Sequence, residues 1–194
     1  MESEHLRLDV LTAERIPEIF AALGTDPDIY RWLPFTAPKS VDDLVPVLEG
    51  FIRDTDSGSR IAYAVILKSS GLAIGTSSFL DLNPIHNSLE IGSTFYAKEY
   101  WRSFVNTESK ILLLSEAFDV RQVERVTLKT DSMNERSRAA ILRLGATFEG
   151  VLRHHMLRPD GSWRDSAYFS ILKSEWPAVK ENLQTKLLSQ SNTK

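Results

Sequence analysis

The sequence predicts an α/β (α+β) protein in which helices cover a mixed, mostly antiparallel sheet. Two observations lead to this prediction. Short apolar runs rich in β-branched residues indicate strands, and the segments between some of them repeat apolar residues at helical spacing. The expected order is strand, two helices, three strands, helix, strand, helix and two strands. This order favours a layered architecture whose first half is largely antiparallel.

The N-terminal part of the chain contains an expected strand and helix. Residues 5–10 alternate between polar and apolar, which is typical of a strand. Thr12 is placed to cap a helix whose apolar face runs from Ile16 to Leu23. Gly24 follows the last apolar residue and is expected to end that helix.

A proline-rich aromatic segment separates this helix from the next. Residues 26–38 hold three prolines and three aromatic residues, and we expect them to be irregular. A second helix is expected over 42–52, after Ser40, with Pro46 either in its first turn or at a kink.

The rest of the chain combines strands, turns and helices. Residues 68–71 form a turn sequence between two apolar runs and predict a hairpin. Residues 158–161 (Arg-Pro-Asp-Gly) are a strong turn signal, and Gly145 is placed to end a helix. These signals predict strands at 61–67, 72–80, 88–96, 123–130, 147–157 and 162–172, and helices at 107–118 and 134–144.

Length and composition restrict the possible functions. With 194 residues, one domain over residues 1–188 is expected, followed by a frayed polar tail at 189–194. The chain has no cysteine, which excludes disulfides, thiolate metal sites and a cysteine nucleophile. A net charge of −3 gives no support to nucleic-acid binding. The N-terminus does not resemble a signal peptide, and no apolar run approaches the ~20 residues that span a bilayer. We therefore expect a cytoplasmic protein without nucleic-acid or membrane partners.

Several short phrases then point to a family. They are Glu90-Ile91-Gly92, Asn106-Thr107-Glu108, Asn134-Glu135-Arg136-Ser137, Arg143-Leu144-Gly145-Ala146 and Glu149-Gly150. Their order and spacing resemble the GNAT superfamily of acetyl-CoA-dependent N-acetyltransferases. The segments Leu6-Arg7-Leu8 and Arg31-Trp32-Leu33-Pro34 are similar to the RimJ/RimL-like branch, which acetylates the N-termini of ribosomal proteins. The resemblance extends over about residues 5 to 175.

The resemblance implies a cofactor site. In a GNAT fold the sheet splays between the strands at 88–96 and 123–130, with helices on both faces, and the pantetheine arm of acetyl-CoA bonds to strand backbone in the gap. The implied contacts there are Phe95 and Tyr96. The pyrophosphate would lie on the loop that opens the next helix, and its implied contacts are Arg102, Ser103, Phe104, Val105, Asn106 and Thr107.

The phosphate loop is also where the sequence departs most from the family. The family places Arg or Gln, Gly, and Gly or Ala where this chain has Trp101, Phe104 and Asn106. Backbone N–H donors remain without glycine if the loop needs no positive φ, and Asn106 tolerates a left-handed conformation better than most residues. Alternatively, Asn106 or Thr107 only caps the helix, which is compatible with phosphate binding.

The resemblance also implies catalytic residues. Glu90 is the candidate base, acting directly or through water; alternatively it is a surface carboxylate paired with a base on the next strand. Many family members carry a tyrosine acid where this chain has Ile141, and in the ribosomal-protein branch a serine three residues after the Asn is the usual substitute. The resemblance therefore implies Ser137 as the candidate proton donor to the leaving thiolate; alternatively, Ser137 only faces a neighbouring carbonyl. Asn134 and Arg138 are candidate cofactor contacts, as is Arg136. Alternatively, Asn134 only caps the helix and the two arginines are solvated.

The acceptor is expected to be a primary amine. Tyr30 and Trp32 are the candidate substrate-binding residues, with a core role as the alternative. A protein N-terminal α-amine is favoured because its pKa near 8 demands less of a base than lysine does; a small amine stays possible. His154 and His155 are adjacent on a strand and cannot pair on a metal, so no metal site is expected. The rival hypotheses are an acyl-CoA-binding module without chemistry and a protein-interaction domain, and a homodimer is possible by analogy.

Overall fold

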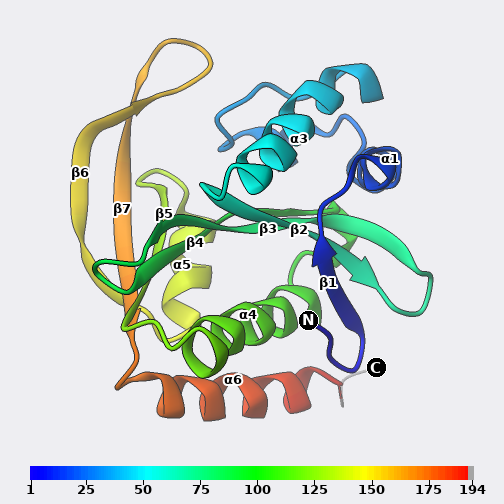
Figure 1. Ribbon diagram of the computed structural model, residues 1–194. Helices are drawn as coiled ribbons and strands as arrows, with labels where there is room; N and C mark the ends of the chain where they lie inside the picture. The colour runs from blue at the N-terminus through cyan, green and yellow to red at the C-terminus, as the bar shows by residue number, and fades with distance from the viewer. Residues whose placement is uncertain (192–194) are drawn as a thin grey trace.

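The computed structural model describes residues 1–191, which contain a seven-stranded sheet flanked by helices (Figure 1). The strand order is β1-β2-β3-β4-β5-β7-β6, and every neighbouring pair is antiparallel except β4 and β5, which are parallel. The strands are β1 (Leu6–Val10), β2 (Arg60–Leu67), β3 (Leu72–Asn83), β4 (Ser88–Tyr96), β5 (Arg125–Asp131), β6 (Thr147–Leu157) and β7 (Trp163–Leu172). The predicted mixed, mostly antiparallel sheet is confirmed.

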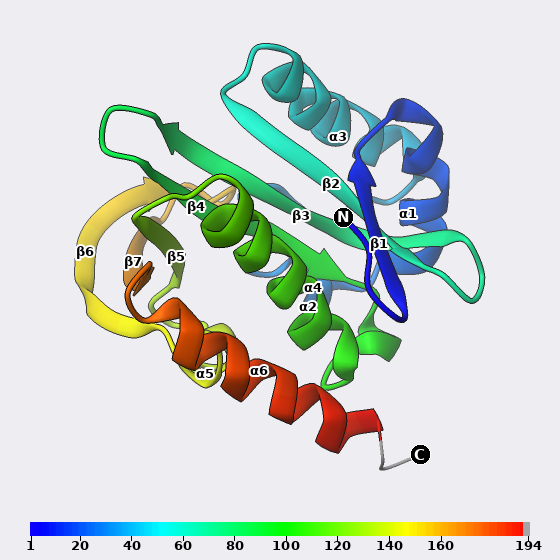
Figure 2. The same cartoon turned by 60° about the horizontal axis from the view of Figure 1, so that its bottom comes forward.

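Helices lie on both faces of this sheet. They are α1 (Ile16–Leu23), α2 (Pro27–Tyr30), α3 (Val41–Asp56), α4 (Phe104–Ser115), α5 (Glu135–Arg143) and α6 (Trp176–Ser191). One core joins buried residues of α1 and α3 to the sheet, and a second joins those of α4, α5 and α6 to its other face. Figure 2 shows α4 and α6 side by side across this second face. None of the helices in residues 1–191 has both the length and the apolar character needed to cross a bilayer.

Local sequence signals explain most helix ends. Gly24 (φ +62°) and Gly145 (φ +97°) follow α1 and α5 in a conformation that favours glycine. The carboxylate of Asp43 accepts the backbone N–H of Ser40, 3.2 Å away, and closes the start of α3. Pro46 lies inside α3 rather than in its first turn. Thr12 precedes a short 3₁₀ turn (Ala13–Arg15) instead of capping α1 directly.

Two helices were not predicted. The segment expected to be irregular contains α2, a single turn that begins at Asp26, whose side chain accepts the N–H of Asp28. The C-terminal helix α6 packs through Trp176, Val179 and Leu183. It continues to Ser191 through the first residues of the expected tail, and residues 192–194 of that tail lie outside the described residues.

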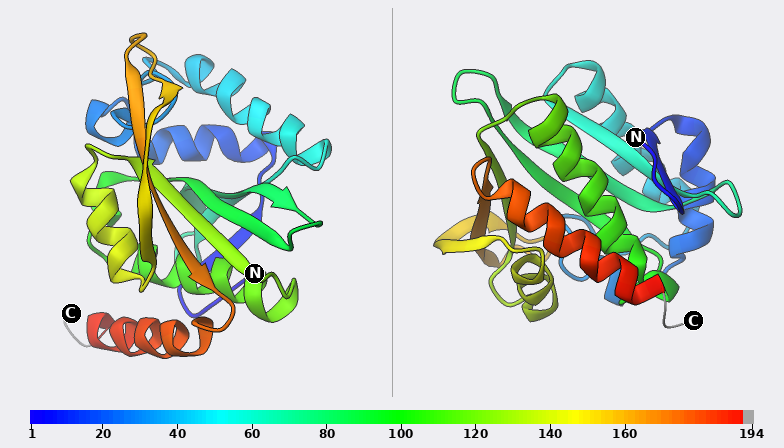
Figure 3. Two further views of the ribbon diagram at one scale, coloured as in Figure 1. Left: turned by 90° about the vertical axis from the view of Figure 1, so that its left-hand side faces the viewer. Right: turned by 90° about the horizontal axis from the view of Figure 1, so that it is seen from below.

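The two halves of the sheet meet at one short pairing. Strands β4 and β5 pair only through Ser88–Glu90 and Arg125–Thr127 and then diverge. Beyond this point β4 keeps β3 as its partner, and β5 keeps β7. Figure 3 shows β6 and β7 standing at the outer edge of the sheet with α6 below them. The predicted splay between these two strands is therefore confirmed.

Candidate active site

The gap between β4 and β5 is the first component of the site. From Ile91 onward β4 has no strand on its β5 side, and the same holds for β5 from Leu128 onward on its β4 side, within the described residues. A strand edge without a partner leaves backbone N–H and C=O groups available, and an extended ligand can pair with them. The side chains of Phe95 and Tyr96 are buried, and the Tyr96 hydroxyl lies 2.6 Å from that of Ser109. Only their backbone groups are therefore suited to contact a ligand in this gap.

Glu90 lies at the point where the two strands separate. Its side chain is on the opposite face of β4 from Leu89 and Ile91, which pack in the α4 core. The residue is 2% exposed, and its carboxylate is 2.8 Å from Lys129 Nζ on β5. Burial raises the pKa of Glu90, while Lys129 opposes that rise. The alternative role for Glu90 was a surface carboxylate paired with a base on the next strand. The carboxylate is indeed paired with such a base, but it is buried rather than on the surface.

Gly92 supplies the space for this carboxylate. A Cβ atom at position 92 would lie 2.7 Å from Glu90 Oε1 and 2.8 Å from Leu80 Cδ1, both closer than side chains normally approach. The phrase Glu90-Ile91-Gly92 therefore combines an inward carboxylate with the residue that makes room for it.

Polar side chains on β5, β6 and β7 continue from Glu90 and form what we call the branch-point cluster: Glu90, Lys129, His155 and Tyr168. Lys129 Nζ lies 6.0 Å from the centre of the Tyr168 ring, and the Tyr168 hydroxyl is 3.3 Å from His155 Nε2. Sequence reasoning missed Lys129 and Tyr168. The signal was present, because every second residue is polar along much of both predicted strands, at 125, 127 and 129 and at 164, 166, 168 and 170.

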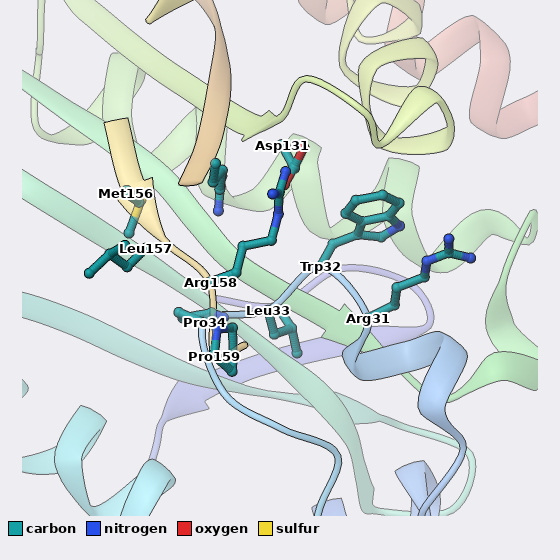
Figure 4. A pocket seen from close by; sticks show the side chains of 10 residues that line it. Arg31, Trp32, Leu33, Pro34, Asp131, Met156, Leu157, Arg158 and Pro159 are labelled. Carbon is teal, nitrogen blue, oxygen red and sulfur yellow. The ribbon is translucent and has the colours of Figure 1, made fainter. Parts of the chain in front are cut away.

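A pocket opens where the β6–β7 hairpin approaches the segment before α3 (Figure 4). We call it the hairpin pocket. Residues 31–34 line one side and residues 156–159 the other, with Asp131 and Arg164 also in its wall. Asp131 is buried and accepts from Arg158 at 2.9 Å (Nε) and 2.8 Å (Nη2). Figure 4 shows the Arg158 side chain reaching toward Asp131 and the Trp32 ring facing into the same space.

The two aromatic candidates for substrate binding are separated by the fold. Trp32 lines the hairpin pocket. Tyr30 is buried, donates its hydroxyl to the Gly24 carbonyl at 2.9 Å, and packs edge-on against Phe35. Burial raises the pKa of Tyr30 to about 12. The position of Tyr30 favours the core role that the sequence left open.

The loop before α4 lacks the family glycines but still needs a positive φ. That φ is +62° and belongs to Arg102, whereas Phe104 and Asn106 are already helical. Ser103 caps the helix by accepting the Val105 N–H at 3.2 Å, and donates to the Tyr100 carbonyl at 2.7 Å. Asn106 therefore has no need of the left-handed conformation that it could tolerate, and the alternative of a cap at Asn106 or Thr107 is wrong because the helix begins at Phe104. The N-terminus of α4 still presents first-turn amides to an anion.

Two arginines flank this helix start. The Arg136 guanidinium lies 3.6 Å from the centre of the Trp101 ring, and the Trp101 indole N–H donates to the Tyr96 carbonyl at 3.2 Å. Burial lowers the pKa of Arg136, as does the charge of Arg102, whereas Asp28 raises it. The charges of Arg136 and Arg102 therefore lie near enough to interact. Arg138 instead donates to the Ser132 carbonyl at 3.2 Å. Arg136 is therefore better placed than Arg138 to meet a phosphate.

The start of α5 lies at the β5 side of the gap. Asn134 is buried and its Oδ1 accepts the Ser137 N–H at 3.0 Å, so the predicted cap is confirmed. Ser137 is half-buried, and its hydroxyl makes no hydrogen bond to the described part of the chain. The side chains of Val105 and Thr107, in contrast, are buried in α4.

A sheet that splits between β4 and β5, with the N-terminus of α4 following the open strand, is the arrangement of an acyltransferase fold. Residues 5–147 match the Acetyltransferase (GNAT) domain, and the chain belongs to this family of acyltransferase enzymes. The predicted family membership is thereby confirmed.

Individual relatives cover nearly the whole chain. The Bacillus subtilis (strain 168) protein "Putative ribosomal N-acetyltransferase YdaF" is 29% identical over 182 residues, 92% of this chain and 97% of the relative. The solved structure of a GCN5-related N-acetyltransferase from Brucella melitensis is 33% identical with a TM-score of 0.89, and the match covers 96% of this chain and 84% of that one. The structure of Mycobacterium smegmatis RimJ in complex with CoA-disulfide is 20% identical with a TM-score of 0.79 over 93% of this chain and 88% of that one, which shows a shared fold.

Proposed function

We propose that this protein transfers the acetyl group of acetyl-CoA to a primary amine, with a protein N-terminal α-amine as the favoured acceptor. The observation that carries the proposal is the buried carboxylate of Glu90 at the point where β4 and β5 separate. A base beside this gap adjoins the place where an extended thioester arm would end. The name of YdaF, "Putative ribosomal N-acetyltransferase", belongs to that protein and supports a ribosomal protein as the acceptor.

The residues of the gap fit the cosubstrate. Unpaired β4 backbone suits the pantetheine arm, while the start of α4, with Arg102 and Arg136, suits the pyrophosphate. Bound acetyl-CoA would supply an activated acyl carbonyl and a thiolate leaving group. With no cysteine in the chain, transfer occurs by direct attack of the amine rather than through an acyl-cysteine.

Two side chains would move the protons. As the C–N bond forms and the C–S bond breaks, Glu90 accepts a proton from the amine, through a water because the carboxylate is buried. Ser137 donates a proton to the departing thiolate from a hydroxyl that has no other described partner, and the serine oxygen regains a proton from solvent water. The raised pKa of Glu90 brings it nearer neutral pH, and only its ionised form is a base. Activity is therefore expected to fall as pH drops through that pKa.

Thermal melting followed by a thiol-release assay tests the proposal. Acetyl-CoA should raise the melting midpoint because it binds the folded state, and N-terminal peptides should then release free CoA thiol. Glu90→Gln should lower kcat/KM by about 10²–10⁴-fold, the usual contribution of a general base. Ser137→Ala tests the proton donor in the same assay. Glu116→Gln, on the turn after α4, is the matched control and should leave the rate unchanged.

Three outcomes would contradict parts of this proposal. Failure of any acyl-CoA to stabilise the protein at millimolar concentration would remove the cosubstrate assignment. Stabilisation without thiol release from any amine would identify a binding module that lacks chemistry. Unchanged rates in both Glu90→Gln and Ser137→Ala would retain the acetyltransferase activity but overturn the mechanism.

A further inference from the structure

The hairpin pocket is lined by an arginine, Arg164, that has a buried nitrogen without a hydrogen-bond partner. Arg164 lies on β7 opposite Met156 of β6, in the wall of the pocket. Its Nε is buried and has no hydrogen-bond partner, and no carboxylate in residues 1–191 lies within ion-pair distance of its guanidinium. A buried donor without a partner costs free energy in the folded protein.

The other buried charges nearby are matched. Asp131 is paired with Arg158 and Glu90 with Lys129, each at 2.8 Å. Lys129 also pairs with the exposed Asp81 at 3.7 Å. Neither buried carboxylate lies within ion-pair distance of Arg164. Burial and the charge of Arg158 lower the pKa of Arg164, whereas Asp131 and Glu90 raise it. An arginine nevertheless keeps its proton at any pH near neutral, so the pocket wall carries two positive charges without an ion-pair partner in residues 1–191, Arg164 and the exposed Arg31, which lies over the Trp32 ring.

The arrangement connects this charge to the proposed chemistry. Arg164 lies near enough to Glu90 for the two charges to interact. A ligand in the pocket would have Trp32 on one side and Met156 on the other, which are apolar surfaces without charge of their own. A guanidinium presents parallel N–H donors that match the two oxygens of a carboxylate.

We propose that Arg164 binds a carboxylate of the acceptor, so that this enzyme prefers amines that carry a carboxylate a few bonds from the reacting nitrogen. The inference rests on the proposed acetyltransferase function and adds the class of acceptor. The carboxylate has two possible sources, the free α-carboxylate of an amino acid or an acidic side chain next to a peptide N-terminus, and both have the same chemistry at Arg164.

Matched acceptors that differ only in this charge test the proposal. The peptide arm compares N-terminal Ala-Glu and Ala-Gln peptides, and Glu-Ala with Gln-Ala peptides, of otherwise identical sequence. The small-molecule arm compares a free amino acid with its amide. In wild type, kcat/KM for the acidic member of at least one arm should exceed that of its partner by about tenfold or more, the usual effect of a hydrogen bond to a charged group. The arm that shows the preference identifies the source.

Variants then attribute the preference to Arg164. Arg164→Gln should bring the ratio of kcat/KM for the acidic acceptor to that for the amide acceptor to about one. Arg164→Lys keeps the charge but loses the parallel N–H donors of the guanidinium, and it should leave an intermediate ratio. Arg153→Gln is the matched control, because Arg153 is an exposed arginine of β6 outside the pocket, and it should keep the wild-type ratio. A binding readout is added: in the presence of CoA, the acidic peptide should raise the melting midpoint of wild type more than that of Arg164→Gln.

The outcomes separate this inference from the proposed function. Turnover of acidic and amide acceptors at equal rates would overturn the inference and leave the acetyltransferase function standing. Loss of the preference in Arg153→Gln as well as in Arg164→Gln would also overturn it. If no amine is acetylated although acetyl-CoA binds, the proposed function fails, and equal melting shifts for acidic and amide peptides would then reject the carboxylate site itself.

Discussion

Lys110 gives the strongest quantitative prediction about stability. This residue of α4 is buried against the sheet, where its Nζ donates to Thr94 at 2.7 Å and Ser77 at 3.4 Å. No carboxylate within residues 1–191 forms an ion pair with it. Burial lowers the pKa of Lys110 to about 7 from its ordinary value of 10.5. Between these two values the unfolded chain holds one more proton at this residue than the folded chain.

The sign and size of the pH dependence of the free energy of unfolding follow from proton linkage. A group that binds more protons when unfolded makes the free energy of unfolding rise with pH, by about 1.4 kcal/mol per pH unit. For Lys110 this rise begins near pH 7 and ends as the unfolded lysine titrates above pH 10, and it amounts to about 4 kcal/mol over three units. Lys110→Met removes this dependence. The hydrogen bonds lost to Thr94 and Ser77 cost about 1 kcal/mol each, so at pH 7 the variant should be more stable by about 2 kcal/mol.

Urea denaturation of both proteins at pH 7, 8, 9 and 10 measures the effect. Other titrating groups are shared by the two proteins, so the difference between their free energies of unfolding isolates Lys110. The advantage of Lys110→Met should shrink with each pH step and reverse by pH 10. A difference that stays constant across this range would show that the folded protein keeps Lys110 charged, and would refute the reasoning.

Three further substitutions test the site and its supports. Gly92→Ala should lower kcat by about tenfold or more, because its Cβ would displace the Glu90 carboxylate; an unchanged kcat in steady-state assays would argue against Glu90 as the base. Arg102→Gly relieves the strain of a positive φ, so the free energy of unfolding measured in urea should rise by about 1 kcal/mol. The same substitution removes a cation, so the KM for acetyl-CoA should rise. If that KM does not move, Arg102 has no part in phosphate binding. Asn134→Ala removes the α5 cap and should cost about 1 kcal/mol, whereas Asn134→Ser should keep most of it in the same denaturation measurement.

The order of the elements could be predicted from local sequence. Strands β4 and β6 have the predicted bounds, 88–96 and 147–157, and the turns at 68–71 and 158–161 join paired strands. Hydrophobic periodicity, turn residues and glycine C-caps are properties of neighbouring residues, and short-range forces decide them. The short helix α2 and the C-terminal helix α6 were missed. Of these, α6 holds its place by packing Trp176, Val179 and Leu183 against the core, which is a tertiary contribution.

The candidate site divides in the same way. The sequence motif around Glu90 led to the prediction of the two strands that diverge. The motif around Asn134 led to the prediction of the cap of α5. Sequence reasoning erred at the phosphate loop, because the residue that adopts a positive φ there depends on where α4 begins. It left Tyr30 open between a substrate role and a core role, and the fold turns that ring into the core.

The sequence by itself determined the family, the layered fold and the strand that carries Glu90, since each depends on patterns within short stretches of chain. Only the tertiary structure decided that this carboxylate is buried against Lys129 and that Arg136 approaches the phosphate loop. It also decided that Arg164 is left without a partner in the hairpin pocket. These features depend on contacts between residues far apart in sequence. The register and twist of the sheet, rather than local conformational preference, determine which charged side chains come into contact.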